Sequence, residues 1–163
     1  MSKKYGYDTQ ILRSARITFW FYLICIPLIV FIFLIPYLQY GTIHLSLISI
    51  IYVAMFIFFA IQAYRSFLVM RTVKTSFCEL DEKTISGINI ESPYQKGTPF
   101  TIARDEILGV GVKQMSIGNA RVFHALILNT QSKKYSLFAV DQLGEIRKAL
   151  QDNDSEPFSE SQQ

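Results

Sequence analysis

The sequence predicts a membrane protein of the α+β class, in which a two-helix transmembrane hairpin precedes a small antiparallel β-barrel or sheet capped by a C-terminal helix. Three observations carry this prediction. The 48 residues between Arg16 and Arg65 include no Asp, Glu, Lys or Arg. Beyond them, apolar residues alternate with period two, as in half-buried strands. Near the C-terminus the apolar spacing becomes that of one face of a helix.

The uncharged stretch is long enough for two membrane passes, since one helix needs roughly 20 apolar residues to cross a hydrocarbon core about 30 Å thick. We expect transmembrane helices at Ile17–Leu38 and Ile43–Ala63, so that the hairpin occupies residues 17–63. Gly41 is the single glycine of the stretch and suits the turn, and Pro36 just before it helps to end the first helix.

Two other interpretations of this stretch fit less well. A buried hairpin of a soluble protein would carry a polar stripe at helical spacing, and neither segment has one. A cleaved signal peptide would have an apolar region of about 7–15 residues and a small-residue cleavage site. The apolar segment here is longer, and no such site follows it.

Lys and Arg collect on the cytoplasmic side of membranes, so the flanking charges predict the orientation of the hairpin. The connection Gln39–His44 carries neither residue and is expected outside. The predicted topology and membrane-surface residues are Lys3, Lys4, Arg13, Arg16, Arg65, Arg71 and Lys74. Aromatic rings expected near the two interfaces are those of Trp20, Tyr22, Tyr37, Tyr40 and Tyr64. We therefore expect a multi-pass protein of the cell (plasma or inner) membrane with both termini in the cytoplasm.

The remaining chain divides by composition. Residues 1–16 are predicted to be a basic cytoplasmic tail, 65–151 a cytoplasmic domain, and 152–163 a disordered acidic tail. The net charge of +3 comes from basic residues close to the expected bilayer, which suits anionic lipid headgroups. The lipid bilayer is thus an expected partner, and a nucleic-acid partner is not required by this charge.

The alternating segments predict six or so antiparallel strands in the cytoplasmic domain. They are 73–80, 84–90, 100–103, 107–117, 121–129 and 134–140, with polar turns or loops between them. Gly118-Asn119 is expected to be a two-residue hairpin turn, and the fragment Gly109-Val110-Gly111 a bend or bulge in its strand.

A C-terminal amphipathic helix is predicted from Leu143, Ile146, Ala149 and Leu150, which share one helical face. Asp141 is the expected N-cap. This helix would close one open end of the curved sheet, which cannot bury both of its faces alone.

The order of these segments resembles that of the bacterial pleckstrin-homology-like (PH-like) membrane proteins with an N-terminal two-helix hairpin. The resemblance lies in FCELDEKTISGI (Phe77–Ile88), FTIARDEILGVGVKQ (Phe100–Gln114) and YSLFAVDQLGEIRKAL (Tyr135–Leu150). The middle segment is similar to a recurring step of that family, in which a polar turn with an acidic pair precedes an Ile and a valine-rich strand. The resemblance implies that the domain is PH-like and that it binds a partner protein rather than catalysing a reaction.

No catalytic constellation, cofactor motif or metal-ligand spacing is recognisable in the sequence. His44 and His124 are its two histidines, and no nucleophile or carboxylate is placed beside either by the pattern. Cys25 and Cys78 fall in different predicted parts and show no metal-binding spacing. Accordingly, we expect no enzyme activity, no cofactor and no metal.

Specific inositide binding is also not expected. Eukaryotic PH domains hold phosphoinositides with basic residues in the first hairpin loop, and the matching loop Leu80–Thr84 is net acidic here. The membrane segments carry no Asp, Glu, Lys, Arg or His between His44 and Tyr64, which argues against a transport pathway.

The hypothesis that fits best is a non-catalytic, membrane-anchored interaction module that binds a membrane or cytoplasmic protein at the cytoplasmic face, with a role in immunity or envelope stress. An accessory or assembly subunit of a larger membrane complex is the alternative. A membrane enzyme or transporter is the third, and it fits least. The oligomeric state, the partner and any lipid preference are not predicted by the sequence.

Overall fold

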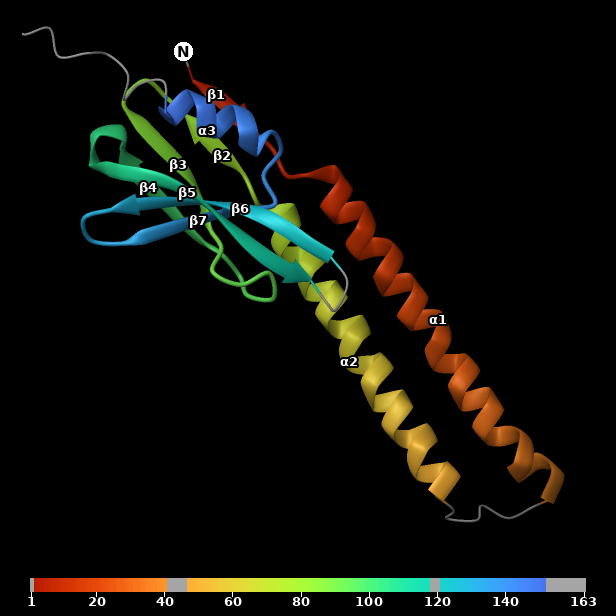
Figure 1. The fold of residues 1–163 in the computed structure, drawn as a ribbon. Helices are drawn as coiled ribbons and strands as arrows, with labels where there is room; N and C mark the ends of the chain where they lie inside the picture. Colours follow the sequence, from red (N-terminus) through yellow and green to blue (C-terminus); the bar gives the residue numbers. More distant parts are fainter. Residues whose placement is uncertain (1, 41–46, 118–120, 152–163) are drawn as a thin grey trace, which may run out of the picture. The chain divides into compact units, whose positions relative to one another are not determined.

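The computed structural model describes residues 2–40, 47–117 and 121–151 (Figure 1). They form two compact units. Gln10–Arg71 make up the helical unit, and the residues up to Thr9 together with those from Thr72 onward make up the folded unit. The folded unit is therefore assembled from two separate parts of the chain, and the whole helical unit is inserted between them.

The helical unit is built from two long helices, α1 (Thr9–Tyr40) and α2 (Leu47–Thr75). By length and composition, both are able to cross a membrane. The two helices predicted from the sequence are present, although α1 begins at Thr9 rather than at Ile17 and continues past Pro36. Similarly, α2 continues past Ala63 to Thr75, since the following residues include neither Gly nor Pro to stop it. Apolar composition thus marked the uncharged part of each helix and not its ends.

Aromatic side chains join α1 to α2 in antiparallel order along their length. Ring centroids are 6.3 Å apart for Phe19 and Phe67, 5.5 Å for Tyr22 and Phe59, and 6.0 Å for Phe33 and Tyr52. Pairs at such distances add stabilisation beyond the burial of their area. The predicted turn between the helices falls mainly on 41–46, which lie outside the described residues, as does His44.

The folded unit has two antiparallel sheets. One has the order β1-β2-β3-β4, and the other the order β5-β6-β7. Their bounds are β1 Lys3–Tyr5, β2 Cys78–Leu80, β3 Thr84–Asn89, β4 Thr98–Ala103, β5 Ile107–Ile117, β6 Arg121–Thr130 and β7 Lys134–Phe138. A single 3-10 turn, Arg104–Glu106, joins β4 to β5. The strands expected from 84 onward are confirmed within a few residues.

The predicted strand at 73–80 is only partly correct. Residues up to Thr75 continue α2, and the strand itself is limited to Cys78–Leu80. The expected bulge near Gly109 is confirmed by a shift in the pairing of β5 with β6 between Ile107 and Gly109. The predicted Gly118-Asn119 turn lies outside the described residues.

The core of the folded unit lies between its sheets and the final helix α3 (Leu143–Gln151). Ile146 and Leu150 of α3 are buried in one cluster with apolar side chains of both sheets, among them Ile85, Leu128 and Leu137. The predicted C-terminal helix is therefore confirmed. The helix begins at Leu143, and the carboxylate of Asp141, the predicted N-cap, accepts a hydrogen bond (2.9 Å) from the backbone N–H of the adjacent Gln142.

The first residues of the chain do not form the predicted basic tail. Lys3–Tyr5 make up strand β1, which pairs with β2 in the register Lys3 with Leu80 and Tyr5 with Cys78. Tyr5 is 5% exposed and belongs to the core cluster. The N-terminus is thus part of the folded unit, and it borders β2 as an edge strand. The predicted acidic tail 152–163 lies outside the described residues.

The residues that follow β1 pair with a second part of the folded unit. The Asp141 N–H donates to the Gly6 carbonyl at 2.9 Å, and the Asp8 N–H donates to the Ala139 carbonyl at 2.8 Å. Tyr7 and Val140 form an antiparallel bridge between these two bonds. We call Lys3–Asp8 the strap, because it joins β2 of one sheet to the connection between β7 and α3.

Candidate functional site

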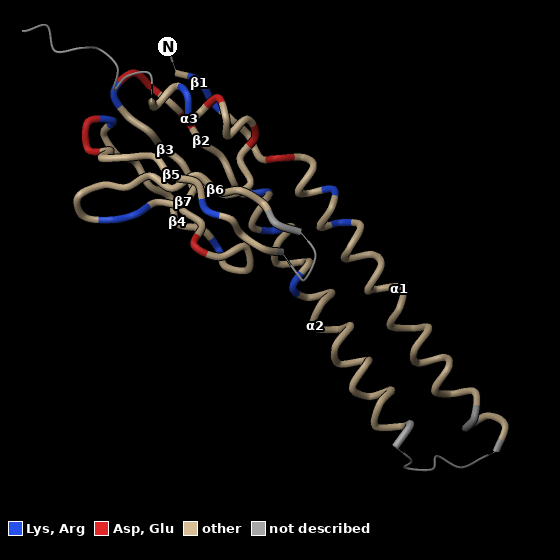
Figure 2. The backbone as a smooth tube through the Cα atoms, viewed as in Figure 1, with Lys and Arg blue, Asp and Glu red and all other residues tan. Residues whose placement is uncertain are grey.

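The predicted membrane-surface residues fall into two groups in the structure (Figure 2). Arg13, Arg16, Arg65 and Arg71 lie on α1 and α2 of the helical unit, outside the uncharged part of each helix. Within that unit α1 and α2 are antiparallel, so the two arginines near the start of α1 and the two near the end of α2 belong to the same end of the hairpin. Lys3, Lys4 and Lys74 belong to the folded unit.

The two lysines of the strap contact the folded unit. Lys3 Nζ forms an ion pair with the Glu145 carboxylate of α3 at 3.0 Å and lies 5.0 Å from the centre of the Tyr5 ring. The hydrogen bond with Glu145 raises the pKa of Lys3 above its usual value. Lys4 Nζ lies 5.4 Å from the centre of the Phe77 ring. Both side chains therefore contribute to strap attachment as well as to surface charge.

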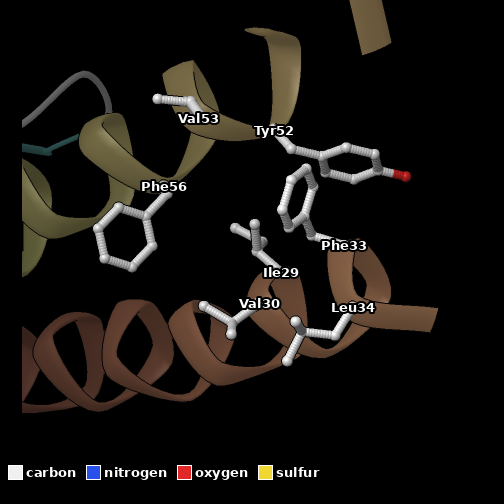
Figure 3. A pocket seen from close by; sticks show the side chains of 7 residues that line it. All are labelled: Ile29, Val30, Phe33, Leu34, Tyr52, Val53 and Phe56. Atoms are coloured by element: carbon white, nitrogen blue, oxygen red, sulfur yellow. The ribbon is translucent and has the colours of Figure 1, made fainter. Parts of the chain in front are cut away.

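An apolar pocket lies between the two helices (Figure 3). Its volume is about 150 Å³, and it is open on one side. The lining side chains are Ile29, Val30, Phe33 and Leu34 of α1 with Tyr52, Val53 and Phe56 of α2. The hydroxyl of Tyr52 is their single polar side-chain group, and in Figure 3 it points away from the others. Such a lining suits hydrocarbon and offers no acid, base or nucleophile to a substrate.

Acidic side chains do not gather into a site in the part of the chain that the structure describes. There, no group of three or more His, Cys, Asp and Glu is placed to hold a metal ion. Asp105 and Glu106 lie on the exposed 3-10 turn before β5. The acidic loop after β2 is a tight turn, in which the Asp81 N–H donates to the Thr84 carbonyl at 2.9 Å.

His124 and Cys78 carry the imidazole and the thiol of the described part of the folded unit. His124 is exposed in mid-strand on β6, opposite Gln114 of β5. Cys78 has no exposed surface, and burial together with the nearby Glu79 charge raises the pKa of its thiol to about 12. A thiol of this kind is protonated at neutral pH and is therefore a poor nucleophile.

Sequence reasoning missed the strap altogether. The charges of residues 1–16 suggested a tail, and β1 is too short to show a strand period. One signal was present, since Tyr5 is a large aromatic residue within a short polar segment. An aromatic residue at such a position suggests an anchor in a core.

Comparisons with protein-family models, with curated proteins and with solved structures found no match to this chain.

Proposed function

We propose that this chain is a non-catalytic interaction module of the cell membrane. In this proposal α1 and α2 cross the bilayer as a hairpin, and the folded unit is a PH-like domain held at the cytoplasmic face, where it binds a protein partner. The observation that carries the proposal is the insertion of two long apolar helices between paired strands β1 and β2.

This insertion supports a two-pass arrangement with both termini on one side. Tyr5 and Cys78 are partners in the sheet, although the entire helical unit lies between them in the chain. A single crossing would separate the two strands by the thickness of the bilayer and break this pairing. Two crossings return the chain to the side from which it left.

The distribution of charge supports the cytoplasmic side for the folded unit. The described ends of α1 and α2 that lead into this unit carry Arg13, Arg16, Arg65 and Arg71, and the apolar parts carry no charge (Figure 2). Basic residues near membrane helices are retained in the cytoplasm. A PH-like identity is supported by the sequence resemblance and by antiparallel strands that end in one C-terminal helix.

Membrane insertion and topology are tested together by cysteine labelling in intact cells. In a Cys25→Ser background, we expect His44→Cys to react with an impermeant maleimide from outside. Lys83→Cys, in the exposed turn after β2, should react only after the cells are permeabilised. Extraction of the protein by alkaline carbonate, or labelling of Lys83→Cys in intact cells, would contradict the proposal.

Binding to a partner needs its own test. Purification in mild detergent through a tag on the C-terminus should recover a second protein in fixed ratio to this chain. If the role is immunity, expression in a sensitive strain should raise tolerance to one peptide of a panel. Recovery of this chain alone, with unchanged tolerance across the panel, would count against an interaction module.

An accessory subunit of a larger membrane complex is the second candidate, and the open apolar pocket between α1 and α2 favours it. A side chain from a partner helix would fill this space. Val30→Trp, which fills the pocket from within, should then weaken co-purification of the partner. Ile24→Trp, a change at an exposed position on α1 outside the pocket, is the matched control.

A further inference from the structure

The two helices enter the folded unit through very different connections. The last turn of α2 is buried in the folded unit, with Thr72 4%, Val73 0% and the following Ser76 3% exposed. The Thr72 hydroxyl donates to the Gln95 carbonyl at 3.1 Å, and the Ser76 hydroxyl donates to the Thr72 carbonyl at 3.2 Å. The end of α2 is therefore a fixed part of the folded unit.

The start of α1 follows the strap directly in the chain, since the strap ends at Asp8 and α1 begins at Thr9. Four of the six strap residues, namely Lys3, Lys4, Gly6 and Tyr7, are exposed. The ion pair of Lys3 with Glu145 is also exposed, with 62% and 54% of the two side chains accessible. Exposed pairs of this kind contribute little to stability. Tyr5 is the one deeply buried anchor, so the strap can separate from the folded unit at a lower cost than the end of α2.

The strap leads directly to α3. Its partners Ala139 and Asp141 lie just before the helix, which begins at Leu143. Ala139 and Gln142 both have a φ of 56°, in the left-handed region that residues other than glycine adopt at an energetic cost. The bonds from the strap help to hold this strained connection, and their loss frees it to relax.

We propose that the strap is a releasable clamp through which a displacement of α1 is passed to α3. Release removes the bonds to Ala139 and Asp141, loosens the first turn of α3, and uncovers the edge of β2. The end of α2 stays in place as the fixed point. The clamp itself is a property of the folded unit, whereas its use as a membrane sensor rests on the proposed function.

The N–H of Asp8 allows a test with a matched control, because Asp8→Pro removes this donor and Asp8→Ala retains it. Hydrogen exchange followed by mass spectrometry is measured on the full chain in detergent micelles. Exchange in α3 and β2 should rise about three- to tenfold in Asp8→Pro relative to Asp8→Ala. Amides of β3 and β6 should stay within about twofold in both. Equal α3 exchange in the two variants would overturn the proposal.

A variant with a disulfide between β1 and β2 tests the same proposal if Asp8→Pro does not fold. Lys4 and Glu79 are partners in the register of β1 with β2, and Lys4→Cys with Glu79→Cys places two thiols there. In a Cys25→Ser background, the oxidised form should show slower exchange in α3 than the reduced form. Identical rates in the two forms would show that the strap does not control α3.

The link to α1 is tested in nanodiscs of short-chain and long-chain phosphatidylcholine, since membrane helices tilt in response to bilayer thickness. Exchange in α3 should differ between the two bilayers for the reduced protein, and this difference should vanish once the strap is cross-linked. No difference in the reduced protein, or one that persists after cross-linking, would overturn the coupling. Failure of the chain to insert into either bilayer would count instead against the proposed function, and the detergent experiment would still decide on the clamp.

Discussion

Gly87 is a residue at which the packing of β3 leaves no space for a side chain. A Cβ atom there would lie 2.9 Å from the Phe77 carbonyl oxygen and 3.0 Å from Leu137 Cδ2. The backbone carbonyl cannot move away without disturbing the approach to β2. The sequence identified this glycine only as one position in an alternating strand, because close contacts between distant segments leave no local signal.

The substitution Gly87→Ala is therefore expected to destabilise the folded unit by about 1–3 kcal/mol, the usual cost of overpacking. Gly109→Ala is the matched control, since nothing lies within 4 Å of a Cβ built there. It should change stability by less than about 0.5 kcal/mol. Thermal unfolding of both variants in the same detergent gives the comparison, and equal melting temperatures would refute the steric explanation.

Cys78 carries a prediction about pH. Burial raises the pKa of its thiol from 9.0 to about 12, so the folded protein retains a proton that the unfolded chain loses. This contribution to stability is fully present below pH 9 and is lost as pH rises toward 12. At pH 10 the loss is on the order of 1 kcal/mol. Cys78→Ala should show a smaller fall in melting temperature between pH 8 and pH 10 than the unchanged protein.

The same thiol should resist alkylation. At pH 8 iodoacetamide is expected to modify Cys78 only after the protein unfolds, while Lys83→Cys in the exposed turn reacts at an ordinary rate. Peptide mass spectrometry in a Cys25→Ser background distinguishes the two sites. Rapid modification of Cys78 in the folded protein would show that its burial is incomplete.

At the scale of elements, α3 was predicted well and β2 only in part. The spacing of Leu143, Ile146 and Leu150 is that of a helical face, and this face is the one buried in the core. Residues 73–75 alternate as a strand would, yet they continue α2. Helix formation spreads cooperatively from the turns already formed, and it prevailed there over a local pattern of only a few residues.

The burial of α3 predicts a large effect at one of its positions. Ile146 has no exposed surface, and Ile146→Ala should cost about 2–5 kcal/mol through lost burial and the cavity left behind. Arg147→Ala, at the exposed neighbouring position, should stay within about 0.5 kcal/mol of the unchanged protein. A similar small effect for both changes, measured by thermal unfolding, would show that α3 adds little to the core.

For the whole molecule, the sequence indicated two helices and a strand-rich domain but not how they are joined. Composition and periodicity describe neighbouring residues, whereas the pairing of β1 with β2 joins residues far apart in the chain, such as Lys3 with Leu80 and Tyr5 with Cys78. No pattern within residues 1–16 identifies the distant strand with which Lys3–Tyr5 pair. The basic residues of this segment were used to predict topology, and the pairing of Lys3–Tyr5 with β2 was not predicted.

This architecture predicts that the folded unit can exist without the helical unit if both of its parts are kept. A chain in which residues 10–71 are replaced by a flexible Gly/Ser linker of about 15 residues should fold as a soluble protein. A chain that starts at Thr72 should unfold at a lower temperature or aggregate, since the edge of β2 is left open. Equal stability of the two chains would show that the strap is dispensable.

The position of β1 in the chain also determines the order in which the elements can pair during synthesis. The first strand leaves the ribosome before both long helices, and its partner β2 follows them. The four-stranded sheet therefore cannot be completed until the helical unit has been synthesised, and α3 closes the core later still. In the proposed membrane arrangement, insertion of the helices therefore precedes completion of the folded unit. Strand β1 has no strand partner until β2 (Cys78–Leu80), about halfway along the chain, has been synthesised. Completion of the four-stranded sheet therefore shows that both long helices have already been synthesised.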